Sequence, residues 1–125
     1  KITVTLRKSY GGAHIVMSCK QLRGDVNYAW PSANIAVMGA DGAVEILYSK
    51  ELKATADPTK RAELKEEKKK EYDDLFCNPY YAASFGYIDD VIEPANTRFR
   101  VIRALVQLEN KKVDNPVRKH DNLPM

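Results

Sequence analysis

The stretch RKSYGGAHIVM, from Arg7 to Met17, places two adjacent glycines between a strand pattern and a helix pattern. Before it, KITVTL (Lys1 to Leu6) alternates apolar and polar residues, which is the period of a strand with one buried face. After it, apolar residues from Ile15 to Leu22 recur at helical spacing. The sequence therefore predicts a strand, a sharp corner at Gly11-Gly12, and a short helix that ends before Gly24.

The rest of the chain alternates strand patterns with helix patterns. Strands are expected in β-prone runs between turn residues, at 28–30, 34–38 and 87–94. Helices are expected where apolar residues share one face, at about 41–54, 59–76 and from 97 onward, followed by an extended tail at 111–125. This alternation indicates an α/β fold built from layers.

Capping residues mark three of the helix starts. We expect Asp41 and Asp57 to cap the helices that follow them, with Pro58 at the first helical position, and Asn96 or Thr97 to cap the last helix. On that last helix, four apolar residues at helical spacing predict a stripe that faces the core: Phe99, Ile102, Leu105 and Val106.

Length and composition describe one ordinary domain. The chain has 125 residues, of which 44% are hydrophobic and 30% are charged. Its net charge of +3 comes from basic residues interspersed with acids, so nucleic acid is not a favoured partner.

Cys19 and Cys77 form no metal-binding or redox motif, which favours a reducing, intracellular compartment. No stretch reaches the roughly 20 apolar residues that span a bilayer, so we expect no membrane insertion. The strand pattern starts at Lys1 without a methionine or a leader, which is how a fragment of a longer protein would begin.

The glycine corner has two interpretations. Bare backbone lets a ligand approach closely, and the N–H groups at a helix start lack partners inside the helix, so Gly11-Gly12-Ala13 could bind an anion or a developing oxyanion. Alternatively, the glycines only allow a tight turn with positive φ. Neither GxGxxG nor GxxxxGK[ST] is present, so the corner is not a phosphate loop of either known type.

No side chain stands out as a nucleophile, a general base or a metal ligand. His14 and His120 are far apart in sequence, and we interpret each as a surface or pocket-lining residue. Asp89 and Asp90 would point to opposite faces of a strand, which favours a structural hydrogen bond or salt bridge. None of the serines near these segments lies in a GxSxG motif: Ser9, Ser18 and Ser32.

Two further segments have both a functional and a structural interpretation. The charge run KRAELKEEKKKEYDD (Lys60 to Asp74) could dock a carrier or nucleic acid, but its mixed signs favour a solvated outer helix. The aromatic segment FCNPYYAASFGY (Phe76 to Tyr87) is accompanied by no basic stripe. We therefore assign it to core and interface packing rather than to a base-stacking platform.

Several segments together resemble a known family. KITVTLRKSYGGAHIVM, NYAWPSANIAVMGADGAVEIL, NPYYAASFGYIDDVIEP, NTR and RKHDNLPM occur here in the order found in the C-terminal half of carboxyltransferase subunits of biotin-dependent acyl-CoA carboxylases. The nearest likeness is to the propionyl-CoA carboxylase β subunit, together with transcarboxylase and methylmalonyl-CoA decarboxylase subunits. The resemblance extends over nearly all 125 residues.

The resemblance implies a crotonase-like (ClpP-like) spiral of β-β-α units. It makes residues 1–125 the C-terminal, biotin-side domain of a two-domain subunit that acts as a hexamer. In this family, the backbone amides matching Gly12 and Ala13 donate to the ureido oxygen of carboxybiotin, and Gly11, Tyr10 and Ile15 lie at the substrate site. The cofactor is biotin on a partner carrier domain, and no metal is implied for this domain.

The remaining partners follow from the same resemblance. They are acyl-CoA, the biotin carboxyl carrier domain, biotin carboxylase and the N-terminal carboxyltransferase domain. The expected location is the bacterial cytoplasm or the mitochondrial matrix.

One departure from the family pattern concerns acyl specificity, since family members often read YGGAYD where this chain has Ile15 in place of the acidic residue. The apolar residue leaves acetyl-CoA, propionyl-CoA or a broader choice open. By itself, a chain without the CoA-binding half is expected to be a binding and assembly module without turnover.

Overall fold

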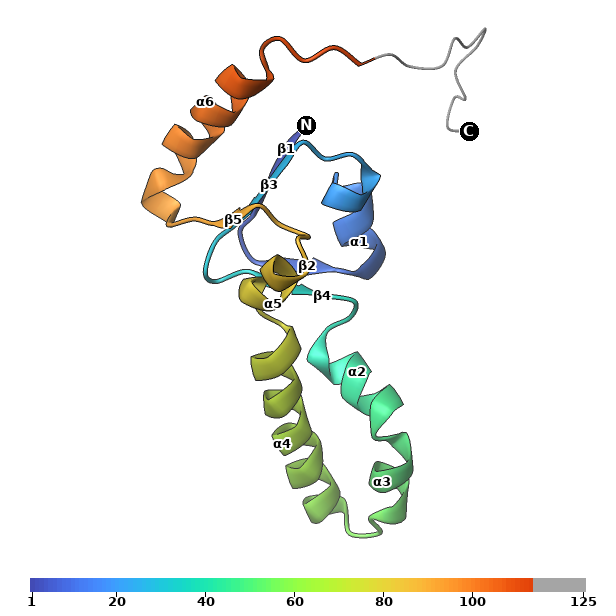
Figure 1. The fold of residues 1–125 in the computed structure, drawn as a ribbon. Coiled ribbons are helices and arrows are strands. Elements are labelled where there is room, and N and C mark those ends of the chain that lie inside the picture. The colour runs from blue at the N-terminus through green and yellow to red at the C-terminus, as the bar shows by residue number, and fades with distance from the viewer. Residues whose placement is uncertain (114–125) are drawn as a thin grey trace, which may run out of the picture.

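The computed structural model describes residues 1–113, which form two small parallel sheets with helices around them (Figure 1). The strands are β1 (Ile2–Thr5), β2 (Lys8–Tyr10), β3 (Val26–Ala29), β4 (Asn34–Ala36) and β5 (Asp90–Val91). The helices are α1 (Gly11–Val16), α2 (Ala40–Leu47), α3 (Ser49–Ala54), α4 (Pro58–Phe76), α5 (Pro79–Ser84) and α6 (Thr97–Leu108). Two short 3-10 turns, η1 (Lys20–Leu22) and η2 (Pro94–Asn96), complete the order.

The strand pairing confirms a spiral of β-β-α units. The order β1-β2-α1 is followed by β3-β4-α2. The first strand of each unit joins one sheet, ordered β1-β3-β5, and the second strand joins another, β2-β4. All pairs are parallel, with Ile2 opposite Val26 and Tyr10 opposite Ala36. Equivalent corners therefore stack at the same edge, so the segments after β2 and after β4 lie next to each other.

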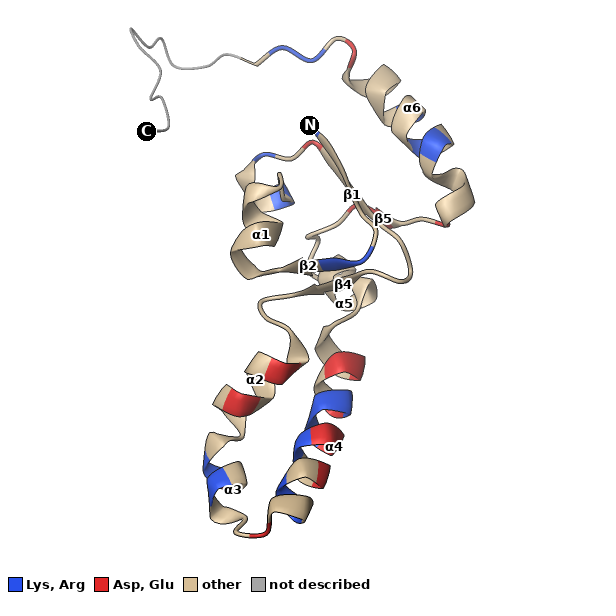
Figure 2. Cartoon of the chain, turned by 180° about the vertical axis from the view of Figure 1, so that it is seen from behind, with Lys and Arg blue, Asp and Glu red and all other residues tan. Residues whose placement is uncertain are grey.

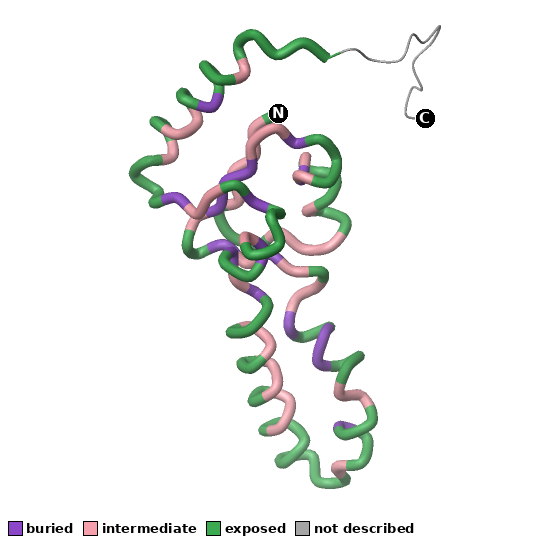
Figure 3. The backbone as a smooth tube through the Cα atoms, viewed as in Figure 1, coloured by how far each residue is buried: buried purple, intermediate pink, exposed green. Residues whose placement is uncertain are grey.

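The central strand β3 separates two hydrophobic clusters. Adjacent strand residues point to opposite faces, so Tyr28 and Ala29 belong to different clusters. Tyr28 packs with Ile92 and with Ala104 of α6. On the other face, Ala29 packs with residues around β4, α5 and β5: Ala33, Ile35, Ala82 and Ile88. The core is small, and most purple segments in Figure 3 lie on or near the strands and α2.

The helix predicted after the glycine corner is shorter than expected. It ends at Val16 and is followed by Ser18 with φ 76° and then by η1. A residue with positive φ cannot continue a right-handed helix, so the apolar spacing up to Leu22 spans two separate elements. No residue of α1 is buried, and Val16 is 76% exposed, so the buried Cys19 belongs to the turn after the helix and not to an apolar helix face.

The second predicted helix also differs in detail. Gly39, with extended backbone, precedes the first helical residue, and Asp41 lies inside the first turn of α2 instead of capping it. The Asp41 carboxylate pairs with Lys69 of α4 at 3.1 Å. Tyr48, with φ −105° and ψ 19°, interrupts the helix, so the expected single helix is α2 followed by α3.

Helices α2, α3 and α4 form an arm that projects away from the sheets (Figure 1). The predicted start of α4 is confirmed, because Asp57 accepts a hydrogen bond from the Thr59 amide at 2.9 Å and Pro58 is the first helical residue. The expectation of a solvated helix is confirmed too, since α4 has no buried residue. An exposed ion pair links α2 to α4, with Lys65 at 2.6 Å from Glu45. Figure 2 shows the mixed charges along α4.

Helix α6 corrects the prediction of a core-facing stripe. Phe99, Ile102, Leu105 and Val106 are between 50% and 65% exposed. The sheet instead receives the other side of the helix, where Ala104 is fully buried. Helical periodicity predicts a stripe but cannot choose between two stripes on one helix.

The strand predicted at 87–94 is reduced to Asp90–Val91, because the flanking residues form turns and η2. His120 and the tail beyond Val113, with its RKHDNLPM motif, lie outside the described residues. Within residues 1–113, none of the helices combines the length and the apolar character needed to cross a bilayer.

Candidate oxyanion corner and adjoining cavity

The corner depends on the conformation of Gly11. The extended residue Tyr10 ends β2, and Gly11 begins α1 with φ +51°. A Cβ atom built on Gly11 would lie 2.8 Å from the Val37 carbonyl oxygen, in the segment after β4. Only glycine combines this left-handed backbone with so close an approach to a neighbouring main chain. Gly11 therefore makes the turn, as one of the two interpretations of the corner requires.

Gly12 and Ala13 have a different environment. Both are exposed, and a Cβ on Gly12 would meet no atom within 4 Å. The first N–H groups of a helix have no carbonyl partner in the preceding turn, so the amides of Gly12 and Ala13 can donate to a group outside the helix. The corner thus combines exposed donors with open space above them.

An apolar cavity of about 480 Å³ adjoins the corner. His14 and Ile15 of α1 form one part of its wall, and Val37 and Leu47 form another. Four aromatic residues from α4, α5 and the segment after α5 also line it: Tyr72, Phe76, Tyr81 and Tyr87. The remaining lining residues are Gln21, Ile35, Ala36 and Ala82. Phe76 and Tyr81 meet edge to face, with ring centroids 5.2 Å apart. This cavity could hold an apolar or flat ring-shaped group beside the corner.

The corner follows from local sequence patterns, but most of this wall does not. Tyr81 and Tyr87 belong to the aromatic segment expected in core and interface packing, yet both are exposed and line the cavity. The β-β-α unit that occurs twice could have indicated which residues form the wall. Because β2 and β4 are parallel neighbours, the residues after each strand meet at one edge, which brings Val37 next to Gly11.

His14 is held beside the corner by a polar contact. Its Nδ1 lies 2.9 Å from the Ser9 hydroxyl oxygen of β2. Burial lowers the pKa of His14 below the ordinary histidine value, because a charged imidazolium is poorly solvated there. The folded chain therefore favours the neutral form of the His14 imidazole over the protonated form.

This lowered pKa predicts an acid-sensitive contribution to stability. The unfolded chain takes up the proton more readily, so the contribution of His14 is present above about pH 6.5 and declines as the pH falls below it. We expect the free energy of unfolding to fall less between about pH 7.5 and pH 5.5 in His14→Gln than in the unsubstituted chain. Urea unfolding at both pH values measures this, and an equal pH dependence in the two proteins would contradict it.

Tyr10 is placed away from the cavity wall. Its ring packs against Gly39, where a Cβ would lie 3.4 Å from the ring atom Cε2. Burial is the main cause that raises the pKa of the Tyr10 hydroxyl, followed by the nearby Cys77 and Asp73. The side chain therefore points toward the end of α4, while Gly12, Ala13 and Ile15 form the ligand-accessible part of the corner.

The cysteines are unsuited to nucleophilic chemistry. Cys19 and Cys77 are both buried free thiols. Burial, and then a hydrogen bond with Asp73, raises the pKa of Cys77 to about 12, so the thiol stays protonated at neutral pH. Among residues 1–113, no group of three or more His, Cys, Asp or Glu side chains is arranged to hold a metal ion.

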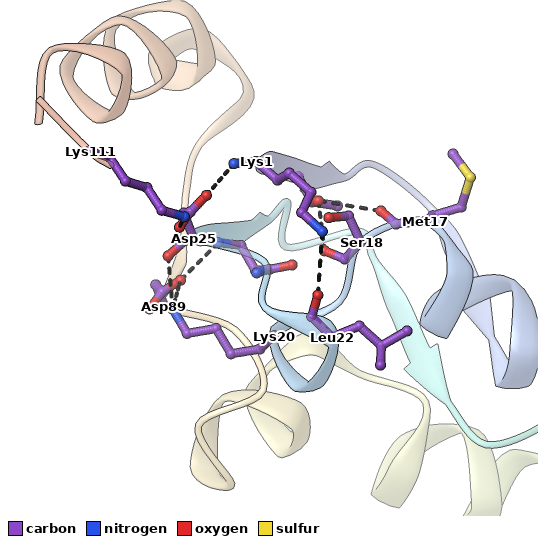
Figure 4. Close-up of polar contacts among 10 residues, drawn as sticks. Lys1, Met17, Ser18, Lys20, Leu22, Asp25, Asp89 and Lys111 are labelled. Carbon is purple, nitrogen blue, oxygen red and sulfur yellow. Dashed lines mark hydrogen bonds and ion pairs between the residues drawn. The ribbon is translucent and has the colours of Figure 1, made fainter. Parts of the chain in front are cut away.

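The two adjacent aspartates are structural, as expected. Asp89 accepts a hydrogen bond from the Asn27 amide at 2.8 Å and pairs with Lys20 at 2.6 Å (Figure 4). Asp90 pairs with Arg100 of α6. These contacts fix the entry to β5 at the edge of the β1-β3-β5 sheet.

A related cluster in Figure 4 is centred on Asp25. Its carboxylate pairs with Lys111. The hydrogen bond from the Lys111 ammonium is the main cause that lowers the pKa of Asp25 below its ordinary value. The cluster joins the start of β3 to the segment after α6, and it contributes no group to the corner.

Comparisons with known proteins agree with this architecture. A family model described as the carboxyl transferase domain matches residues 1–123. The propionyl-CoA carboxylase beta chain of Cereibacter sphaeroides is 56% identical over 125 residues, which cover 100% of this chain and 23% of that protein. The methylmalonyl-CoA carboxyltransferase 12S subunit of Propionibacterium freudenreichii subsp. shermanii is 48% identical over 124 residues, 99% of this chain and 23% of that protein. The chain thus spans less than a quarter of the length of these curated relatives.

A solved structure supports the same assignment. The crystal structure of transcarboxylase 12S, described as a hexamer assembly with methylmalonyl-coenzyme A and methylmalonic acid bound, superposes with a TM-score of 0.88. It is 47% identical to this chain and covers 100% of it, while the chain covers 24% of that structure. The spiral of β-β-α units is accordingly the crotonase-like fold that the sequence implied. The chain belongs to the carboxyl transferase domain family.

Proposed function

We propose that this chain is the biotin-side half of an acyl-CoA carboxyltransferase, within a longer two-domain subunit. The observation that carries the proposal is the corner itself. Gly11 makes the turn against Val37, and Gly12 is exposed, with no atom within 4 Å of the place where a Cβ would lie. In a member of this family, that arrangement suits an acceptor oxygen that gains negative charge during carboxyl transfer.

Biotin on a carrier domain is the cofactor that the family implies. The space above Gly12, where a Cβ would meet nothing within 4 Å, is compatible with a ligand seated directly on the backbone. When bound, carboxybiotin supplies the carboxyl group, and its ureido oxygen is the acceptor that the amides of Gly12 and Ala13 would face. A preorganised donor of this kind contributes about 3–4 kcal/mol to stabilisation of a transition state. The protein needs no nucleophilic side chain, because the cofactor carries the chemistry and the chain supplies orientation.

The acyl group is assigned to the adjoining cavity. Ile15 lies on its wall and is next but one to Ala13, so a group held there would sit beside the donors. The apolar lining favours a short acyl chain such as acetyl or propionyl. Tyr10 supports the corner indirectly. Its ring packs on Gly39 and thereby holds the end of β2 in place.

The partners follow from the longer relatives. They are acyl-CoA, a biotin carboxyl carrier domain with its biotin carboxylase, and the N-terminal carboxyltransferase domain of the same kind of subunit. A hexamer is proposed because the superposed transcarboxylase 12S structure is described as one. The proposed location is a bacterial cytoplasm or a mitochondrial matrix, which is supported by the bacterial relatives and by the mitochondrial relative from human.

A second candidate is a carboxyltransferase of a transcarboxylase or of a methylmalonyl-CoA decarboxylase. It is favoured by the 48% identity to the methylmalonyl-CoA carboxyltransferase 12S subunit. These enzymes would share the corner and differ in their partner subunits. Two properties would therefore distinguish these enzymes from an acyl-CoA carboxylase. They are the direction of carboxyl transfer and the molecule that donates the carboxyl group to biotin or accepts it from biotin.

The test is carboxyl transfer by the complete subunit. We expect it to move the carboxyl group from a carboxylated carrier domain to acetyl-CoA, propionyl-CoA or butyryl-CoA, measured as labelled acid-stable product. The 125-residue chain alone should give no product, because it is expected to lack the half that holds CoA. Transfer in the reverse direction, from methylmalonyl-CoA to the uncharged carrier, would support the second candidate. A folded complete subunit that transfers in neither direction would contradict both.

A further inference from the structure

His14 supplies the only polar side chain of α1, and it lies on the wall of the apolar cavity. Its two neighbours in the chain are assigned to different parts of the reaction. The amide of Ala13 is assigned to the ureido oxygen of biotin, and the side chain of Ile15 to the acyl group. His14 therefore lies between the place where the carboxyl group leaves biotin and the place where the acyl chain receives it. This placement rests on the proposed function.

The cavity offers an incoming carboxylate few partners. Among the described residues, its lining includes no lysine, arginine, aspartate or glutamate. Its hydrogen-bonding side chains are those of His14, Gln21, Tyr72, Tyr81 and Tyr87. A carboxylate that enters an apolar cavity loses its hydration, and this loss is offset only where a donor replaces the water. Of the five side chains, only the His14 imidazole directly follows Gly12 and Ala13 in the chain.

Ser9 holds one nitrogen of the imidazole and leaves the other available. The Ser9 hydroxyl oxygen lies 2.9 Å from Nδ1 of His14. Ser9 belongs to β2, where the register places it opposite Ile35 of β4, another residue of the cavity wall. Because burial lowers the pKa of His14, the ring is neutral at neutral pH. A hydroxyl that donates to Nδ1 leaves the single proton of the neutral ring on Nε2, which is then a donor.

We propose that the His14 imidazole, through Nε2, binds the carboxylate on the α-carbon of the carboxylated acyl-CoA. Ser9 is the positioning residue for this contact, because its hydroxyl holds the ring and selects the tautomer that donates from Nε2. An acyl-CoA without that carboxylate has no such group for Nε2 to bind. His14 therefore distinguishes the carboxylated ester from the uncarboxylated one, whereas Ile15 fits the acyl chain.

The experiment measures the binding of two coenzyme A esters to the complete subunit, with no carrier domain present. Isothermal titration calorimetry gives the dissociation constants of methylmalonyl-CoA and of propionyl-CoA. The ratio of the first constant to the second reports the contact with the carboxylate. His14→Leu removes both ring nitrogens, so we expect this ratio to rise about tenfold or more, while the propionyl-CoA constant changes less than about threefold.

Two amide variants separate the roles of the two ring nitrogens. The amide nitrogen of glutamine reaches about as far from the main chain as Nε2, and that of asparagine about as far as Nδ1. His14→Gln should keep the ratio within about threefold of the unsubstituted value, and His14→Asn should raise it about as much as leucine does. A ratio that asparagine preserves, or that glutamine fails to preserve, would overturn the proposal, because the contact with Ser9 would then only fasten α1 to β2.

Ser9 is tested by the same ratio. Ser9→Ala releases the ring and should raise the ratio about threefold or more, whereas Ser9→Thr keeps the hydroxyl and should not. An unchanged ratio in folded Ser9→Ala would overturn the positioning role, and melting curves by circular dichroism show which variants are folded.

The two levels of the interpretation fail in different ways. If all variants bind both esters with the unsubstituted ratio, the contact between His14 and the carboxylate is wrong and the proposed function stands. If the unsubstituted complete subunit binds neither ester, the proposed function is wrong and the contact with it.

Discussion

Replacing Gly12 by valine in the complete subunit is expected to lower the rate of carboxyl transfer by about 100-fold to 1,000-fold, which corresponds to about 2.7–4 kcal/mol of lost stabilisation. The valine side chain would occupy the open space above the corner, where a Cβ now meets no atom within 4 Å. It would push a bound acceptor away from the amides of Gly12 and Ala13. Steady-state transfer from carboxylated carrier to acyl-CoA measures the effect.

A matched control exists in the second β-β-α unit. Gly42 lies in the first turn of α2, and a Cβ there also meets nothing within 4 Å. Gly42→Val should therefore keep most of the transfer activity, while circular dichroism shows both variants folded. Full activity in folded Gly12→Val would show that the acceptor oxygen is held elsewhere.

Gly11→Ala is expected to act on the fold instead. The new Cβ would lie 2.8 Å from the Val37 carbonyl oxygen, and the residue would have to keep a φ of +51°. Together, the strain and the close contact should lower the free energy of unfolding by about 2–3 kcal/mol. Urea unfolding followed by circular dichroism measures this loss.

The neighbouring glycine provides the control for this variant. Gly12→Ala adds the same methyl group one residue later, in a helical position with open space. It should be neutral or stabilising, by up to about 1 kcal/mol, because alanine is the better helix former. Equal losses in the two variants would mean that α1 tolerates no side chain at either position, and the distinct role of Gly11 would be wrong.

Local patterns predicted the corner and its surroundings well. Alternation placed β1, the paired glycines placed the turn, and the Asp57-Pro58 pair placed the start of α4. Each of these depends on backbone chemistry within a few residues: strand period, positive φ, or a cap. The sequence resemblance added the spiral of units, which no short pattern could supply.

Features that depend on distant partners were not predicted correctly. Asp41 has a side chain that often caps helices, but it lies in the first turn of α2 and forms an ion pair with Lys69 of α4. The stripe on α6 has helical spacing, but the sheet packs against Ala104 on the other side. The cavity wall combines residues from Ile15 to Tyr87, and their proximity follows from the parallel pairing of β2 with β4. Periodicity shows that a face is apolar, and only the tertiary arrangement determines what covers it.

The arm formed by α2, α3 and α4 has a consequence for motion. Its buried residues are few and belong to α2 and α3, whereas α4 contributes none. Exposed ion pairs, Lys65 with Glu45 and Lys69 with Asp41, add only weakly to this packing. An element with so little buried apolar surface opens at a lower free energy than the sheets do, and its amide protons exchange with solvent through that local opening. Because salt screens exposed charge pairs, we expect higher ionic strength to make this opening slightly easier, whereas Tyr72 and Phe76 at the base of the arm keep their aromatic contacts.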